Sequence, residues 1–151
     1  MLREAFTERL KAAMRAKDTR TLTAVRLILT GLKERDVAAR SSGNQQGIAD
    51  PEILRLLQGM IKQRRESIAL YQQGKRPELA RQEEEEIAVI ESFLPRQMSE
   101  EETAAAARTA IAETAAAGPK DMGRVMAHLR ERHAGVIDLA RAGAIVKQLL
   151  G

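Results

Sequence analysis

Three charged side chains have the types and spacing to act together. On a helical wheel, Arg64 falls in the middle of an otherwise apolar face, and Glu83 and Glu86 fall on the apolar stripe of the next predicted helix. If the two helices form a hairpin that turns around Gly74, equal distances from the turn place residue 64 opposite residues 83 to 86. Because a guanidinium within an apolar face needs a partner, the spacing predicts an ion pair from Arg64 to Glu83 or Glu86.

Paired carboxylates can also perform acid–base or metal chemistry, which is the functional alternative for Glu83 and Glu86. No histidine accompanies them, and the sequence has neither a glycine-rich phosphate loop nor a recognisable nucleophile triad. The two histidines, His128 and His133, are five residues apart, whereas two imidazoles on one helix share a metal at a spacing of four. We therefore interpret the charged cluster as structural, and expect no catalytic residue, metal or cofactor.

Two groups of basic residues could contact an anionic partner. The first lies on the polar side of the helix that carries Arg64 and spans ~80° of the wheel. It consists of Arg55, Lys62 and Arg65. The second lies on or beside a short helix, close to three glycines. It consists of Lys120, Arg124, Arg130 and Arg132. Lysine and arginine give salt-dependent affinity for phosphates, but a solvated helix face is the alternative for both groups.

The elements that position these residues follow from periodicity and helix signals. Apolar residues at steps of three and four predict helices over 2–17 and 18–40, the second capped by Asp18. Asp50 and Pro51 then begin a helix that runs to residue 73, where Gly74 supplies a left-handed cap. A helix from Pro77 ends before Pro95, so the last two helices form an αα-hairpin.

Beyond Pro95 the pattern predicts three shorter helices. Ser99 and Glu102 form a capping box that begins an alanine-rich helix to about Ala117. A short helix with an apolar face including Leu129 follows, and Asp138 caps the last one. The sequence thus predicts an all-α protein: a four-helix domain over 1–95 and a small three-helix domain over 96–151.

The composition excludes further classes of site and location. Apolar residues make up 44% of the chain but aromatic residues only 2%, and cysteine is absent, so disulfides and thiolate sites are excluded. No apolar run approaches the ~20 residues that span a bilayer, and the acidic first turns do not fit a secretory signal. We expect a cytoplasmic protein with no membrane association. The net charge of +4 permits an anionic partner without requiring one.

Four segments resemble the YqeY family of bacterial proteins. They read KQRRES at 62–67, GKRPEL at 74–79, FLPRQM at 93–98 and KDMGRVM at 120–126. The resemblance implies a second domain similar to the tail of the B subunit of the tRNA-dependent amidotransferase, which holds the tRNA body. By that likeness Lys120, Arg124 and Arg132 become candidate contacts to tRNA phosphates. The sequence departs from the family where a loop that is often rich in lysine and glycine reads HAGVID at 133–138.

The resemblance and the basic residues together favour a non-catalytic tRNA-binding accessory module, used with an aminoacylation or amidation enzyme. One alternative is a protein–protein adaptor without direct RNA contact. Another is a component of an amidotransferase-type carbon–nitrogen ligase with glutamine as amido donor, although the sequence offers no residues for that chemistry.

Overall fold

The computed structural model describes all 151 residues, and its regular structure is entirely helical, which confirms the all-α prediction. The elements are α1 (Leu2–Ala16), α2 (Thr19–Ser41), α3 (Asp50–Gln73), α4 (Pro77–Glu91), α5 (Glu100–Thr114), the single 3₁₀ turn η1 (Pro119–Asp121), α6 (Met122–Arg132) and α7 (Leu139–Leu150). The chain divides into two compact units, unit 1 over Met1–Leu94 and unit 2 over Pro95–Gly151. None of the helices combines the length and apolar character needed to cross a membrane.

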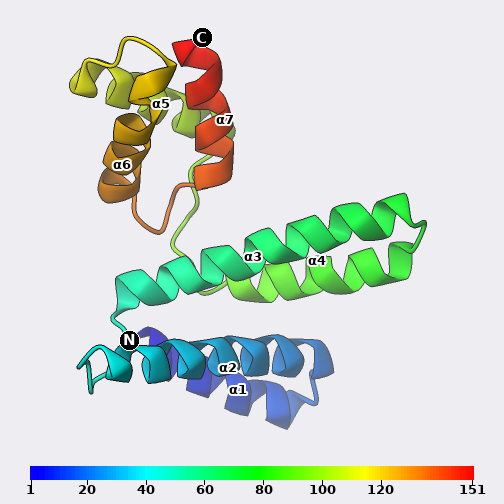
Figure 1. Cartoon of the computed structure of the whole chain (residues 1–151). Coiled ribbons are helices and arrows are strands. Elements are labelled where there is room, and N and C mark those ends of the chain that lie inside the picture. The colour runs from blue at the N-terminus through cyan, green and yellow to red at the C-terminus, as the bar shows by residue number, and fades with distance from the viewer. The chain divides into compact units, whose positions relative to one another are not determined.

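Unit 1 consists of two antiparallel helix pairs, α1 with α2 and α3 with α4 (Figure 1). Helix α2 also contacts both α3 and α4, so one core lies between the pairs. Among its fully buried side chains are Phe6, Ile28, Leu57 and Ile90, one from each helix. Burial of such side chains stabilises by about 1.5–3 kcal/mol each, which makes this core the main source of stability in unit 1.

Three helices end in left-handed residues that are not glycine. Helix α3 continues to its cap at Gly74, whose φ is −81°, and the left-handed residue is Lys75, with a φ of 56°. The prediction of a left-handed Gly74 is therefore wrong by one position. The N–H of Arg76 donates to the carbonyl of Tyr71 at 2.8 Å, which is the long hydrogen bond of a Schellman motif.

The same motif ends α1 at Lys17 and α5 at Ala115, with φ values of 56° and 54°. Because Ala115 already reverses the chain, α5 stops at Thr114 and does not reach the expected position near Ala117. The N–H of Ala116 donates to the carbonyl of Ile111 at 3.1 Å and thereby satisfies an otherwise free helix-end carbonyl.

A polar cluster ties α1, α2 and the following loop together. The Arg3 guanidinium donates to both carboxylate oxygens of Asp36, at 2.7 and 2.9 Å, and also to the carbonyl of Ile48 at 2.7 Å. The N–H of Ile48 donates back to Asp36 at 2.9 Å. Next to it, Gly47 has a φ of +88°, and a Cβ there would lie 2.6 Å from Asp36 Oδ1. The cluster therefore fits only glycine at position 47.

The hydrogen bonds from Arg3 lower the pKa of Asp36 from 3.8 to about 2. A carboxyl with a lowered folded-state pKa adds stability that is present above its unfolded pKa and is lost as the pH falls toward the folded value. Because Arg3 is 39% exposed, we expect Asp36→Asn to cost about 1–2 kcal/mol at neutral pH. Urea titrations should show this difference disappearing as the pH falls from 3.8 to about 2. The matched control, Glu34→Gln on the exposed side of α2, should change stability little at any pH.

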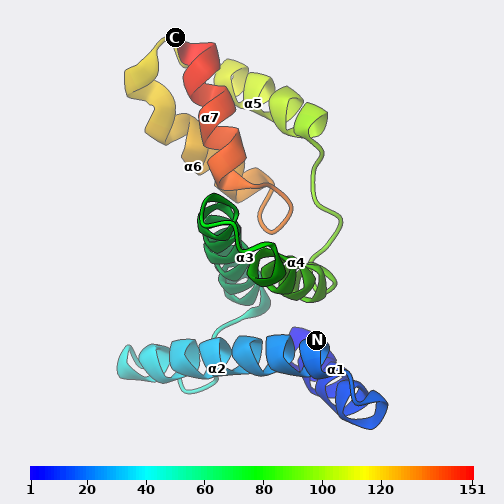
Figure 2. The same ribbon diagram turned by 90° about the vertical axis from the view of Figure 1, so that its right-hand side faces the viewer.

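In unit 2 each of α5, α6 and α7 contacts the other two helices (Figure 2). The core between them includes the buried side chains of Ala107, Val125, Leu129 and Val146. At the start of α5, the hydroxyl of Ser99 accepts from the N–H of Glu102 at 3.1 Å, and Glu102 accepts from the N–H of Ser99 at 2.9 Å. The predicted capping box is confirmed, and it fixes where α5 begins.

Candidate functional site

The charged cluster of unit 1 lies between α3 and α4. Arg64 Nε is 3.0 Å from Glu86 Oε2 and 3.9 Å from Glu83 Oε2, and Arg64 Nη1 donates to the carbonyl of Met60 at 3.1 Å. The side chains of Arg64 and Glu86 are each only 12% exposed. The ion pair therefore lies where the spacing of the two helices predicts it.

Helix α2 adds a second guanidinium that sequence reasoning missed. Arg20 Nε is 3.0 Å from Glu85, and Arg20 Nη1 is 3.8 Å from Glu86 Oε1. Burial raises the pKa of Glu83, and the neighbouring charge of Glu86 raises it further. The contacts of this network join α2, α3 and α4 within unit 1, which supports its interpretation as structural.

The first basic group lies on the exposed side of α3. Arg55, Lys62 and Arg65 are all exposed, as the wheel predicts. Arg65 Nη2 is 3.6 Å from Glu91 of α4, so part of this charge is neutralised within unit 1. An anion bound at this group would therefore meet exposed charges. Water and salt strongly screen the interactions of such charges.

The residues of the second basic group lie on different sides of the surface of unit 2. Arg124, His128 and Arg132 follow one another at steps of four along α6, so they form a single row, which we call the α6 row. Arg130 is rotated by about 160° from Arg132 and lies on another side of the helix. Lys120 lies in η1, directly before α6, and is exposed. Spacing alone could have shown that His128 belongs to the row.

The α6 row is partly neutralised by two acidic side chains. His128 Nε2 is 2.7 Å from Glu113 Oε2, and Arg132 Nη2 is 3.7 Å from Glu113 Oε1. Arg124 Nη2 is 3.3 Å from Asp121, whose pKa is lowered by hydrogen bonds from the N–H groups of Ala117 and Gly118 and by the Arg124 charge. Both arginines remain more than half exposed, so each has donors available to a partner.

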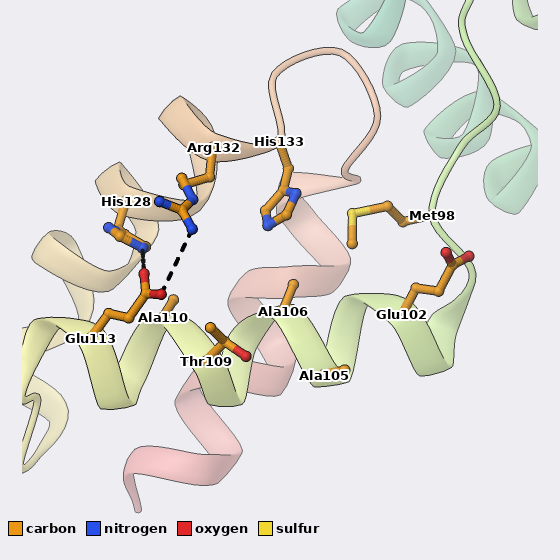
Figure 3. Close-up of a pocket in the computed structure, with 10 residues that line it drawn as sticks. All are labelled: Met98, Glu102, Ala105, Ala106, Thr109, Ala110, Glu113, His128, Arg132 and His133. Carbon is orange, nitrogen blue, oxygen red and sulfur yellow. Dashed lines mark hydrogen bonds and ion pairs between the residues drawn. The ribbon is translucent and has the colours of Figure 1, made fainter.

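A pocket of about 320 Å³ lies beside the α6 row, between α5, α6 and the segment before α5 (Figure 3). Sequence reasoning did not find it. Its lining comprises Met98, Glu102, Ala105, Ala106, Thr109, Ala110, Glu113, His128, Arg132 and His133. Figure 3 shows the alanines and Thr109 along α5, with the two histidines and Arg132 on the α6 side. One end of the pocket therefore carries Arg132 and the histidines together with the carboxylate of Glu113, and its floor is made of small side chains.

Hydrogen bonds to main-chain carbonyls fix the rim of this pocket. The N–H of Met98 donates to the carbonyl of Val136 at 2.8 Å, and Gln97 Nε2 donates to the carbonyl of Gly135 at 2.8 Å. The carbonyl of His133 accepts from the N–H of Val136 at 3.1 Å. Gly135 is buried with a φ of 80°, a conformation that other residues rarely adopt. The loop after α6 thus holds Met98 and His133 on the same rim.

The protein thus belongs to the class of all-α proteins with two helical units. Unit 1 contains an ion-pair network between its helices, and unit 2 carries the α6 row beside a pocket. The chain matches the family described as Yqey-like protein over residues 3–150, and it belongs to the YqeY family. No curated protein matches the chain. The match extends over both units, so family membership applies to the whole chain.

Proposed function

We propose that unit 2 is a non-catalytic tRNA-binding module that works alongside an aminoacylation or amidation enzyme. The α6 row is the observation that carries this proposal, because it presents two exposed arginines on one side of a short helix. Arg124 and Arg132 are eight residues apart, about 12 Å along the helix, so they can contact different phosphates. Lys120 extends the basic surface at the start of the row.

The chemistry of this surface suits a backbone contact. Guanidinium groups bind phosphates through paired N–H donors, and such contacts are independent of base sequence. Unit 2 has eight basic and seven acidic residues, so its net charge is small and the local row matters more than the overall charge. The likeness of this domain to the amidotransferase tail then indicates tRNA as the nucleic acid.

The test is the affinity of the chain for total tRNA, measured by fluorescence anisotropy at two salt concentrations. We expect the affinity of the wild-type protein to fall with salt, because binding releases counterions from the phosphates. Replacing Lys120, Arg124 and Arg132 with alanine should weaken binding at least ~10-fold. The same replacement should reduce the salt slope by about three, since each of the three cations binds one phosphate.

The matched control replaces Arg108, Arg141 and Lys147 with alanine. These residues are exposed on α5 and α7, and their removal lowers the charge of unit 2 by the same amount. An equal loss of affinity in both variants would contradict a specific surface at the α6 row. No binding of the wild-type protein at low salt would rule out the proposal, and retention of one protein partner after nuclease treatment would favour an adaptor.

A further inference from the structure

We propose that the pocket of unit 2 receives one unpaired nucleotide, with the base against α5 and the phosphate at Arg132. That the nucleotide belongs to RNA rests on the proposed function, whereas the pocket itself can be tested with mononucleotides. The volume of about 320 Å³ is at the small end of the ~300–1,000 Å³ found for ligand pockets. It suits a single base and sugar, and is too small for a folded segment of a partner.

The floor and rim of the pocket provide the contacts that an unstacked base needs. Ala105 and Ala106 of α5 offer small apolar side chains to the base, whereas Ala110 is only 1% exposed. In Figure 3 the ring of His133 and the thioether of Met98 reach toward Ala106 from the rim. Single-stranded RNA bases stack on flat rings, including imidazole, and the thioether of methionine makes favourable contacts with aromatic rings.

The two ends of the pocket carry different polar groups, Arg132 with Glu113 at one end and Glu102 at the other, and this difference sets the orientation of a bound nucleotide. At one end both oxygens of Glu113 already have partners, the His128 ring at 2.7 Å and the Arg132 guanidinium at 3.7 Å. Because the guanidinium has five N–H donors and is 60% exposed, Arg132 can bind a phosphate and Glu113 at once. The phosphate therefore belongs at this end.

At the other end Glu102 accepts two hydrogen bonds from Arg96, at 3.1 and 2.9 Å, and one from the N–H of Ser99. The bonds from Arg96 hold the pKa of Glu102 at about 2, so this carboxylate is charged at neutral pH. With Arg96 balancing its charge, this carboxylate contributes acceptor oxygens, which suit the amino edge of a base. Thr109, between the two ends, adds a hydroxyl that can donate or accept.

The site is also held in place before a ligand arrives. The hydrogen bonds from Met98 to Val136 and from Gln97 to Gly135 fix the segment that carries Met98 to the loop that follows His133. A pocket whose walls are already joined loses little conformational entropy on binding, so even a small ligand can gain affinity. The pocket lies beside the α6 row, so the phosphates next to a bound nucleotide could contact the arginines of that row.

The experiment is an NMR titration of the whole chain with each of the four nucleoside 5′-monophosphates at millimolar concentrations. We expect saturable shifts of the methyl signals of Met98, Ala106 and Thr109 and of the ring signals of His133. Inorganic phosphate should move signals of His128 and Arg132 and leave the Ala106 methyl unchanged. This comparison separates binding of a nucleotide from binding of an anion alone.

Two variants fill the pocket without changing charge, Ala106→Leu from the floor and Ala105→Leu from an exposed position of α5. Each should weaken nucleotide binding about 10-fold or more, because the larger side chain occupies the space of the base. The matched control is Ala112→Leu, also exposed on α5 but outside the pocket, which should bind as the wild type does. His133→Ala should reduce affinity by a similar factor through loss of the ring.

The outcomes separate this inference from the proposed function. Absence of saturable shifts in the wild-type protein overturns the nucleotide site, even if tRNA binds to the α6 row. Equal binding by the folded Ala105→Leu variant overturns it as well. Nucleotide binding that disappears in the filled variants supports the nucleotide site. If tRNA does not bind in the same buffer, that result contradicts the proposed function but leaves the nucleotide site standing.

Discussion

Replacing Arg64 with methionine will lower the free energy of unfolding by about 2–4 kcal/mol at neutral pH, as measured by urea denaturation. Methionine keeps the length and helix propensity of the side chain but removes its charge and its donors. Glu86 and Glu83 then lose their main cationic partner while they remain largely buried, with 12% and 23% of their side chains exposed. A buried charge without its partner is among the costliest defects in a core.

The two glutamates should respond differently to neutralisation. Glu86 accepts from Arg64 at 3.0 Å and also faces Arg20, so Glu86→Gln breaks two attractive interactions and should destabilise by about 1–3 kcal/mol. Glu83 is farther from Arg64, and its raised pKa means that the folded state disfavours its charged form. Glu83→Gln should therefore be neutral or stabilising at pH 7.

The sign of the pH dependence follows from the same shift. A carboxyl with a raised folded-state pKa binds protons more tightly when folded, so its contribution to stability decreases as the pH rises through its titration range. The wild-type protein should lose stability relative to Glu83→Gln over that range. A substantial destabilisation by Glu83→Gln, or none by Arg64→Met, would contradict the assigned roles.

This pair was accessible to sequence reasoning because it depends on local rules. The wheel places Arg64 on an apolar face, and Pro77 and the end of α3 fix where the hairpin turns. Counting residues from that turn then places Glu83 and Glu86 opposite Arg64 across the hairpin. Periodicity, capping boxes and first-turn prolines act within about ten residues, so the helix order could also be predicted.

The ends of helices were harder to predict where backbone geometry does not follow residue preference. Lys17, Lys75 and Ala115 adopt the left-handed conformation that favours glycine, at φ values of 56°, 56° and 54°. The Schellman hydrogen bonds that follow each of them compensate for a cost of about 1–2 kcal/mol. The preference for glycine therefore misplaced the left-handed residue at the end of α3, and α5 ends earlier than expected.

The pocket lay beyond sequence reasoning because tertiary packing creates it. Met98, Glu113 and His133 belong to three separate segments, and no spacing rule relates them. Arg20 was missed for the same reason, since its nearest partner on α4, Glu85, is 65 residues away in the sequence. The α6 row was within reach, because steps of four along a helix align Arg124, His128 and Arg132. Grouping Arg130 with them ignored the rotation of the helix.

Replacing Leu129 with alanine will destabilise unit 2 by about 2–5 kcal/mol and unfold much of it at physiological temperature. Leu129 has no exposed surface and lies at the centre of the core formed by α5, α6 and α7. A domain of this size has only ~3–5 kcal/mol of stability from its core, so the loss approaches the total.

Because the buried clusters of the two units share no residue, unit 1 should keep its structure in the Leu129→Ala variant. Amide NMR spectra should then show dispersed signals for unit 1 and collapsed signals for unit 2. The control is Leu149→Ala, on a side chain of α7 that is 45% exposed, which should change stability by no more than ~0.5 kcal/mol. Loss of all dispersed signals in Leu129→Ala would instead mean that the two units fold as one. Selective loss of unit 2 would also remove binding of tRNA and nucleotides, because both proposed surfaces depend on the packing around Leu129.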